Sequence, residues 1–451
     1  MESKTTIGMV GLGKLGLSIA SCFTHKGFDV VGVDINKDSV SKINSGKAPF
    51  YETDLQDIVG KYGGKTLTAS TDFSTLKAAN YIFVIVPTPS NADDTYSNDY
   101  VIPAAKEIAK VIRESSDYKV VSITSTVFPR TMDNIIKPLL ESESGKECGK
   151  DFGMVYNPEF IAVGSLIRDF LNQEMVLIGE HDRRSGDEIA ALYLKVQDSK
   201  PNIARMSMFN AEITKIAYNS FMTTKVTFAN MLAELCSRTI GADVDAITAA
   251  LGMDSRIGNK LIKGSIGYGG PCWPRDNKAF LRFAENNGYK PLLPKAVDLM
   301  NLSIPSSIGD AVELLADKNV DKIAVLGLSY KPNTPLTVES QSLLLAEDLA
   351  KRGFKLLLHD PLVDQCSVDT ICNKYNASFC KSLDECLKKG TFFILATPQK
   401  EYKQLLPENF SEGATILDCW RYMDRRFDES TRVKYIKWGI SSTFPVKPNP
   451  A

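Results

Sequence analysis

The chain has 451 residues, of which 43% are hydrophobic and 24% charged, a composition typical of a globular protein with two or three domains. A net charge of −1 gives no reason to expect nucleic acid or an anionic membrane as a partner, and no apolar run could span a bilayer. The sequence has 9 cysteines without a close CxxC pair and no signal-peptide pattern, which indicates reduced thiols and a cytoplasmic protein. The 3 histidines lie far apart, so no metal site is predicted.

A glycine-rich turn lies between two predicted strands at the N-terminal end. Residues 6–10 predict a buried strand, Gly11-Leu-Gly13-Lys-Leu-Gly16 follows it, and Asp34 ends the next strand. Gly11 permits a tight turn, Gly13 lets backbone N–H groups reach a pyrophosphate, and Gly16 lets helix and strand pack closely. A carboxylate at position 34 would accept from a ribose hydroxyl and repel a 2′-phosphate, which favours NAD over NADP. A turn that binds nothing is the less favoured interpretation. The expected cofactor contacts are Gly11, Leu12, Gly13, Lys14, Leu15, Gly16 and Asp34.

Strands and helices alternate through the first two hundred residues, which predicts a doubly wound parallel sheet. Further segments of this pattern are the strands 81–86, 119–124, 154–156 and 175–179 and the helix 101–114. Ligands of such sheets bind beyond the carboxyl ends of the strands, where Thr88, Thr126 and Glu159 stand. Taken singly, each of these residues is better explained as a helix cap or a turn residue.

From Ser207 the apolar residues recur at three- and four-residue spacing, which predicts a long helix to about Cys236. Such a helix could connect domains and pack against a second subunit. Lys215 and Asn219 share one of its faces, although a lysine there is more often a surface residue.

The stretch from Lys263 to Asp276 has four glycines and two prolines, so it predicts a loop rather than a helix or strand. Its glycines allow close approach to a ligand, and its one thiol, Cys272, suits a nucleophile beside an anionic substrate. On this loop alone, a buried thiol in a turn is equally probable.

A helix predicted after Pro305 leads into a second alternating α/β region, with predicted strands at 322–327, 355–360, 391–397 and, last, 414–418. Gly327 lacks a full GxGxxG, so no second dinucleotide site is assigned. The tail from Ser441, with Pro445, Pro448 and Pro450, predicts irregular structure. The fold class expected is therefore α/β, with two Rossmann-like doubly wound parallel-sheet domains joined by a long central helix and a helical middle region. The expected domains are 1–205, 206–305 and 320–445.

The ordered set of motifs resembles the nucleotide-sugar 6-dehydrogenase family. From about Ile7 to Arg421 the chain carries GLGKLG, VPTPS, STV, NPEF, the Lys215 and Asn219 helix, RIGNK with GYGGPCWPRD, and GLSYKPNT. The resemblance implies a four-electron oxidation of the C6 alcohol of a sugar to a carboxylate, with two NAD reduced per turnover. UDP-glucose, giving UDP-glucuronate, is the first choice of substrate, and UDP-N-acetylhexosamines and GDP-mannose are alternatives.

The same resemblance implies catalytic roles. Cys272 corresponds to a nucleophile that captures the aldehyde as a thiohemiacetal, which the second oxidation converts to a thioester. Lys215 and Asn219 correspond to the pair that stabilises the developing oxyanion. Asp276 and Thr126 correspond to residues that hold and activate water.

Glu159 corresponds to the acid/base residue for thioester hydrolysis. Arg256 corresponds to an arginine that reaches substrate across a dimer contact, so a homodimer or higher homo-oligomer is expected. The C-terminal domain corresponds to the part that binds the nucleotide. Implied substrate contacts are Glu159, Phe160, Lys215, Asn219, Arg256, Lys263, Tyr268, Gly269, Gly270, Tyr330, Lys331 and Arg421. Additional implied cofactor contacts are Thr88, Pro89, Thr126, Cys272 and Arg275.

Three departures from the family pattern bear on substrate choice and NAD affinity. Val163 replaces a frequent second acid, Val338 replaces a frequent arginine, and Pro271 and Trp273 flank the cysteine. Two other functions stay open. A two-electron hydroxyacid dehydrogenase of the 6-phosphogluconate type needs neither the cysteine loop nor a second α/β domain, and a non-catalytic NAD-binding protein would yield no NADH at all.

Overall fold

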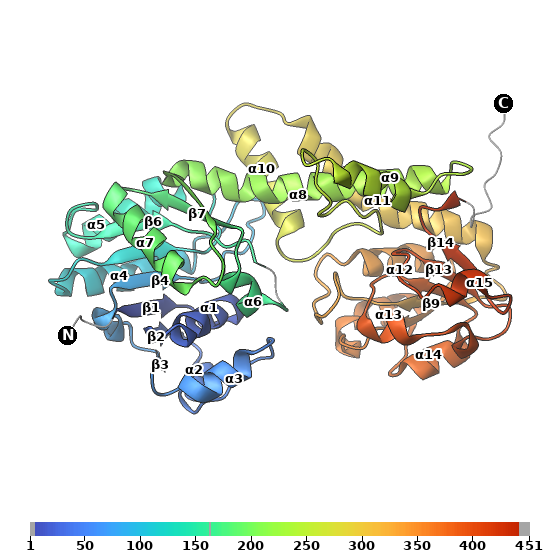
Figure 1. The fold of residues 1–451 in the computed structure, drawn as a ribbon, viewed down its shortest axis with the longest axis horizontal. Helices are drawn as coiled ribbons and strands as arrows, with labels where there is room; N and C mark the ends of the chain where they lie inside the picture. The colour runs from blue at the N-terminus through green and yellow to red at the C-terminus, as the bar shows by residue number, and fades with distance from the viewer. Residues whose placement is uncertain (1–4, 162–163, 442–451) are drawn as a thin grey trace. The chain divides into compact units, whose positions relative to one another are not determined.

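The computed structural model describes residues 5–161 and 164–441 of the chain. It divides into two compact units, the first ending at Ile216 and the second beginning at Ala217. The division falls inside helix α8, Met208–Ser237, which Figure 1 shows as one uninterrupted helix. Its 30 residues confirm the long helix predicted from the apolar spacing.

The first unit is built on an eight-stranded sheet with the order β3-β2-β1-β4-β5-β6-β7-β8. Its strands are β1 Thr6–Val10, β2 Asp29–Val33, β3 Leu67–Ser70, β4 Tyr81–Val84, β5 Val120–Ile123, β6 Gly153–Tyr156, β7 Met175–Glu180 and β8 Asn202–Ser207. All neighbouring pairs are parallel except β6 and β7, which pair antiparallel. The doubly wound architecture is confirmed, with this one antiparallel pair as a difference. The connection between β6 and β7 contains the six-residue α6, which spans only about 9 Å, so β7 starts at the end where β6 finishes.

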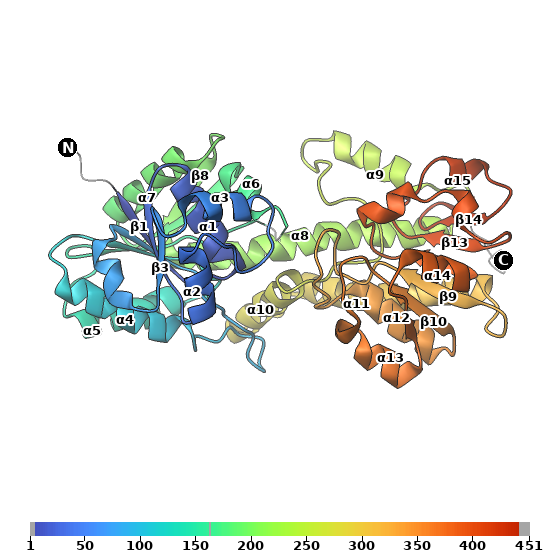
Figure 2. The same ribbon diagram turned by 90° about the horizontal axis from the view of Figure 1, so that it is seen from below.

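Helices cover both faces of this sheet. They are α1 Lys14–His25, α2 Lys37–Asn44, α3 Leu55–Tyr62, α4 Val101–Glu114, α5 Lys137–Ser144, α6 Leu166–Leu171 and α7 Arg183–Val196, with a π-helical turn at Met132–Ile136 and a 3-10 turn at Phe73–Ala78. Apolar residues of α1, α3, α6 and α7 form one core, and those of α4 and α5 form the other. Figure 2 shows α6 and α7 on one side of the sheet and α4 and α5 on the other. The central strands therefore lie between two layers of apolar helix residues and are buried on both faces, as the unbroken apolar run 81–86 predicts.

The second unit contains a six-stranded, wholly parallel sheet with the order β11-β10-β9-β12-β13-β14. Its strands are β9 Lys322–Leu326, β10 Lys355–His359, β11 Ser378–Phe379, β12 Phe392–Leu395, β13 Thr415–Asp418 and β14 Lys434–Lys437. Its helices are α9 Val244–Met253, α10 Trp273–Asn286, α11 Leu292–Leu315, α12 Gln341–Lys351, α13 Asp369–Tyr375, α14 Leu383–Lys389 and α15 Arg426–Glu429, with 3-10 turns at Gln365–Ser367, Lys400–Gln404 and Pro407–Asn409. Apolar residues of α11, α12 and the end of α8 pack on one face, and those of α14 pack on the other. Figure 1 shows α14 below this sheet.

Four details of the sequence prediction are wrong. The strand at 414–418 is not the last, because β14 follows it; its Lys-Tyr-Ile-Lys pattern carries a weak apolar signal. The helix before β9 does not begin after Pro305 but runs through it, and Pro305 is buried with its neighbours in the core. Strands β3, β8 and β11 were not predicted, because they are short or, as in β8, largely polar and partly exposed. The cysteine loop ends at Cys272, since residues 273–276 form the first turn of α10, where a proline is tolerated.

Among the described residues, none of the helices combines the length and apolar character needed to cross a membrane. The same part of the chain holds no group of three His, Cys, Asp or Glu side chains suited to a metal ion. None of the nine cysteines, all of which the structure describes, forms a disulfide. Val163, the prolines of the tail and the end of the expected C-terminal domain lie outside the described residues.

Candidate functional site

The three glycines of the N-terminal turn are required for different reasons. Gly11 has φ +94° and donates its N–H to Val33 O at 2.8 Å, and a Cβ there would lie 2.9 Å from the carbonyl carbon of Ile85. A Cβ on Gly16 would lie 3.0 Å from the carbonyl carbon of Gly11, so helix α1 and the turn can pack together only without a side chain. A Cβ on Gly13 would meet no described atom within 4 Å, which leaves open space above the turn.

The N-terminus of helix α1 borders that open space. Gly13 is its N-cap, and its first turn, with Lys14 and Leu15, carries no acidic side chain to occupy the backbone N–H groups. At the end of β2, Asp34 accepts from Leu12 N at 2.6 Å and from Asn36 N at 2.8 Å. A helix N-terminus beside an open glycine turn, with a fixed carboxylate at the next strand, fits the pyrophosphate and ribose of a dinucleotide.

Two neighbouring loops at the carboxyl ends of strands are tied together by Ser125. Its hydroxyl accepts from Val86 N at 2.8 Å and donates to Val86 O at 2.7 Å. This exchange fixes the loop of Thr88 and Pro89 against the loop of Thr126, and Thr88 is buried there. Ser125 was not singled out from the sequence, because its role depends on a strand 39 residues away.

The loop that follows Thr126 is held by a residue of α8. Glu212 is fully buried, and its two carboxylate oxygens accept from Arg130 N and Met132 N, each at 2.8 Å. Burial raises the pKa of Glu212 to about 7, against the opposing effect of these two backbone donors. Arg130 has a left-handed φ of +82°, so this carboxyl stabilises a strained turn. Nothing in the sequence distinguished Glu212 from other helix residues.

Glu159 occupies a buried polar pocket after β6. One carboxylate oxygen accepts from Gln173 Nε2, and the other lies 2.8 Å from the hydroxyl of Tyr193. Burial raises the pKa of Glu159 to about 7, opposed by the Tyr193 hydroxyl, Lys215 and Gln173 in that order.

Tyr193 also lies 2.7 Å from Asn157 Oδ1. Its single proton can go to only one of these two acceptors. A protonated Glu159 could donate to Tyr193 while Tyr193 donates to Asn157, so the pocket accommodates both charge states. That is the property required of an acid/base residue working near neutral pH.

Lys215 and Phe160 are brought to the same place. The buried ammonium of Lys215 donates to the backbone carbonyl of Glu159 at 2.7 Å and lies 4.5 Å from the ring centroid of Phe160. Asn219 follows one turn later on α8 and donates through Nδ2 to Asp276 Oδ2 at 2.7 Å. The other oxygen of Asp276 accepts from Arg275 Nε at 3.2 Å. The side chains of Asn219 and Asp276 are therefore both buried and held in fixed orientations.

Cys272 is an exposed thiol at the N-terminus of α10. A helix N-terminus favours negative charge, which suits a thiolate nucleophile. Its carbonyl accepts from Asp276 N at 2.8 Å in the first helical turn. Burial, and then the charge of Cys272, raise the pKa of Tyr330 to about 12.

The cysteine loop is pinned through its backbone. Asn301 accepts from Tyr268 N and donates to Tyr268 O, both at 2.9 Å. Gly270 donates to Val338 O at 2.9 Å, and a Cβ on it would lie 2.6 Å from Cδ2 of the Tyr330 ring and closer still to Cε2. Val338 therefore serves this contact through its carbonyl, which any residue supplies.

A second polar network supports the same loop. Asn277, fully buried beside Asp276, accepts from Ser220 of α8 at 2.7 Å and donates to Asp298 of α11 at 2.7 Å. Asp298 in turn accepts from the hydroxyl of Tyr268 at 3.1 Å. The sequence did not identify these supports, although a buried asparagine and an aspartate among apolar helix positions are a signal that could have found them.

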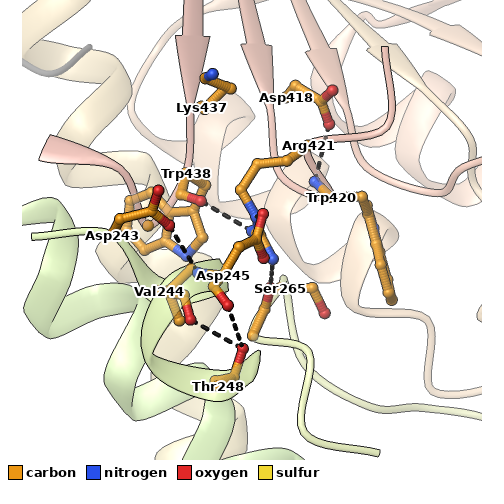
Figure 3. Close-up of polar contacts among 12 residues, drawn as sticks. Asp243, Val244, Asp245, Thr248, Ser265, Asp418, Trp420, Arg421, Lys437 and Trp438 are labelled. Atoms are coloured by element: carbon orange, nitrogen blue, oxygen red, sulfur yellow. Dashed lines mark hydrogen bonds and ion pairs between the residues drawn. The ribbon is translucent and has the colours of Figure 1, made fainter. Parts of the chain in front are cut away.

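The remaining predicted basic residues have different surroundings. Arg256 is 87% exposed at its side chain and pairs with Asp254 at 2.6 Å. Lys331 lies 5.7 Å from the ring centroid of Tyr330. Burial, and then the positive charge of Arg421, lower the pKa of Lys263. Figure 3 shows Arg421 directed at Asp245 of α9 and at the backbone of Trp438.

Comparison with known proteins covers most of this chain. Models of the UDP-glucose/GDP-mannose dehydrogenase family match in three consecutive parts: the NAD binding domain at residues 5–197, the central domain at 209–303 and the UDP binding domain at 324–425. The UDP-glucose 6-dehydrogenase AglM of Haloferax volcanii is 32% identical over 424 residues, covering 93% of this chain and 97% of that protein. The GDP-mannose 6-dehydrogenase of Pseudomonas savastanoi pv. phaseolicola is 30% identical, covering 96% of this chain and 100% of its own length.

A solved structure agrees with these relatives. The UDP-glucose dehydrogenase of the hyperthermophilic archaeon Pyrobaculum islandicum superposes with a TM-score of 0.85 at 28% identity, covering 97% of this chain and 98% of that one. The glycine turn with Asp34, the helix with Lys215 and Asn219, and the cysteine loop all fall within the matched segments. The chain therefore belongs to the UDP-glucose/GDP-mannose dehydrogenase family and is an NAD-dependent nucleotide-sugar dehydrogenase.

Proposed function

We propose that the chain oxidises the C6 alcohol of UDP-glucose to the carboxylate of UDP-glucuronate in two successive two-electron steps. The observation that carries this proposal is Cys272, an exposed thiol at the start of α10 on a loop whose backbone is pinned on both sides. A one-step alcohol oxidation has no use for such a thiol. NAD supplies the hydride acceptor in each oxidation.

The first oxidation converts the alcohol to an aldehyde with loss of a hydride and a proton. The thiolate of Cys272 adds to the aldehyde carbon, and the oxygen takes up a proton to give a thiohemiacetal. Loss of a second hydride and a proton gives a thioester, and water then releases the carboxylate and restores the thiol.

Each polar group has a role that fits its surroundings. Lys215 and Asn219 supply an ammonium and an amide donor for the oxygen that gains negative charge at C6. Glu159, with a pKa of about 7, takes the proton of the attacking water during thioester hydrolysis. Asp276, fixed by Asn219, and Thr126 orient that water.

The cofactor and nucleotide contacts follow the same division of the chain. We assign the dinucleotide to 1–205, the catalytic helix and loop to 206–305 and the nucleotide half of the substrate to 320–445, a division supported by the three matched segments of the family. UDP-glucose is preferred over GDP-mannose because the UDP-glucose 6-dehydrogenase is the more similar of the two relatives above, at 32% against 30% identity.

The test is the yield of NADH with limiting sugar nucleotide and excess NAD, across UDP-glucose, UDP-N-acetylhexosamines and GDP-mannose. Two NADH per UDP-glucose, with slower turnover of the others, is the expected result. Two NADH from a different sugar nucleotide would replace the substrate but keep the chemistry. One NADH from any of them would contradict the role of the thioester and favour the hydroxyacid type of dehydrogenase.

We also propose that the chain self-associates through α8. Phe221, Phe228 and Leu235 are exposed and spaced seven residues apart, so they form one apolar stripe along the helix. Light scattering should show a dimer or larger assembly, and Phe228→Arg should shift it toward the monomer. A monomeric wild-type protein at micromolar concentration would refute this.

A further inference from the structure

Almost all N–H groups of the Arg421 guanidinium form hydrogen bonds within the second unit. Its Nε donates to Asp245 Oδ2 at 2.9 Å, its Nη2 to Gly264 O at 2.6 Å, and its Nη1 to Trp438 O at 2.9 Å and Cys419 O at 3.3 Å. The side chain is only 3% exposed. A guanidinium has five N–H donors, so these bonds engage four of them. Figure 3 shows the side chain enclosed between α9 and the ends of the strands.

The turn that carries Arg421 is built to aim it. Asp418, fully buried at the end of β13, accepts from Trp420 N at 2.9 Å, Tyr422 N at 2.6 Å and Met423 N at 2.9 Å. Arg421 itself has a left-handed φ of +52°. A side chain other than glycine keeps such a conformation where its surroundings over-determine it, and the strain marks a specific role for the direction of this side chain.

What Arg421 holds is the start of the cysteine loop. On the side of α8, a Cβ on Gly264 would overlap the carbonyl of Ala229, and Ser265 N donates to Asn230 Oδ1 at 2.7 Å. On the other side stands the guanidinium of Arg421. Residues 264–265 are thus fixed between the buried face of α8 and the guanidinium of Arg421.

Asp245 completes the arrangement. Its carboxylate is 44% exposed and neutralises Arg421, and it lies on α9, whose Val244 N donates to Gly439 O at 3.0 Å. Lys263 immediately precedes the clamped carbonyl, so Asp245 also offsets the repulsion between the two cations. Loss of either partner would release the carbonyl of Gly264 and unbalance the charge.

We infer that Asp245 and Arg421 form a clasp that fixes the start of the cysteine loop, and that Arg421 is a positioning residue acting through Gly264 rather than a residue that contacts the sugar nucleotide. The inference deepens the proposed function in one respect, since it takes Cys272 as the nucleophile that the loop must present. Its structural half, the ordering of residues 264–270, does not depend on which reaction the thiol performs.

The experiment compares Arg421→Gln, Asp245→Asn and the double variant with wild type by hydrogen exchange of the full-length protein. The amides of Ser265, Tyr268 and Gly270 should exchange about tenfold faster in each single variant, most at Ser265, because these three report the pinned loop. Exchange in the double variant should be no faster than in the single variants, because each substitution already breaks the same Asp245–Arg421 pair.

Arg426→Gln is the matched control, because Arg426 forms a surface pair with Asp424 in the same domain and should leave exchange and turnover unchanged. Steady-state kinetics and titration with UDP separate the two roles of Arg421. A clasp predicts about a tenfold fall in kcat with UDP affinity within twofold of wild type, and no rescue by Arg421→Lys, which lacks the fork.

Unchanged loop exchange together with a tenfold weaker UDP affinity would overturn the inference and make Arg421 a substrate ligand. Additive effects of the two substitutions would overturn it as well. If Arg421→Gln does not fold, Asp245→Asn and Arg421→Lys carry the same exchange test. Failure of the proposed function would appear differently, as absence of turnover in the wild-type protein with the loop amides still protected.

Discussion

Gly269 in the cysteine loop offers a sharp test of how closely the loop must approach its neighbours. A Cβ on Gly269 would lie 2.9 Å from the carbonyl carbon of Glu339 and closer still to its oxygen, whereas ordinary contacts begin at 3.4 Å. The obstacle is backbone, so it cannot rotate away. Gly269→Ala therefore requires the loop to move by at least about 0.5 Å, and by about 1 Å to clear the oxygen.

Cys272 is three residues further along and would move with the loop. A displacement of about 1 Å at a reacting group can cost about a hundredfold in rate, which corresponds to about 2.7 kcal/mol of transition-state stabilisation. Gly269→Ala should therefore lower kcat/KM for the best sugar nucleotide by roughly a hundredfold, measured as initial NADH production. The melting temperature should fall by only a few degrees, because the loop contributes a single residue, Ile266, to a hydrophobic core.

The matched control is Gly60→Ala in α3, where the nearest described atom would stand at 3.4 Å, an ordinary contact. Alanine is favoured over glycine inside a helix, so this variant should be fully active and slightly more stable. The reasoning would be refuted if Gly269→Ala kept kcat/KM within threefold of wild type at an unchanged melting temperature.

Three further substitutions test other parts of the site. Cys272→Ser should lower the production of carboxylate by at least about 10³-fold in a product assay, because no thioester can form; retention of full NADH yield would contradict the mechanism. Asp34→Asn should lower kcat/KM for NAD about tenfold and raise that for NADP, since it removes the charge that repels a 2′-phosphate; an unchanged NAD/NADP ratio would argue against the ribose contact. For Glu159, the neutral carboxyl stabilises the folded state below pH 4.5, and this contribution is lost as the pH rises through about 7. In denaturant titrations, the free energy of unfolding of Glu159→Gln should therefore rise relative to that of wild type by roughly 3 kcal/mol between pH 4.5 and 7, and the difference should stay constant above pH 7. A difference that does not depend on pH would mean that the raised pKa is wrong.

Local patterns in the sequence were sufficient where the chemistry depends on a few consecutive residues. The glycine turn was predicted correctly, because Gly11 and Gly16 act on atoms that the strand–turn–helix pattern itself brings together. The helix 101–114 was predicted with its observed bounds, because its apolar face is strongly periodic.

Partners far apart in the sequence could not be predicted in the same way. The pocket of Glu159 needs Gln173 and Tyr193, and these are ordinary polar residues until β6, β7 and α7 pack together. The turn that holds Glu212 is similar, since its two donors lie 80 and 82 residues away. Such contacts depend on tertiary packing, which single-sequence periodicity does not encode.

The two sheets explain why a Rossmann-like domain need not bind a dinucleotide. In both, a glycine with φ near +90° follows the first strand, and the next residue donates to an aspartate at the end of the second strand: Leu12 to Asp34 at 2.6 Å, and Leu328 to Asp360 at 2.8 Å.

The difference lies in what else the aspartate does. Asp34 is half-buried beside an open turn. Asp360 is buried and also accepts from Ser329 N and Oγ, both at 3.1 Å, and from Gln399 at 3.3 Å. Its carboxylate is occupied by hydrogen bonds from within the domain, so a ribose hydroxyl would have to displace three internal donors. The same backbone plan thus supplies a half-buried acceptor beside an open turn in one domain and a fully buried, internally hydrogen-bonded carboxylate in the other. The side chains around the turn, rather than the fold, decide which.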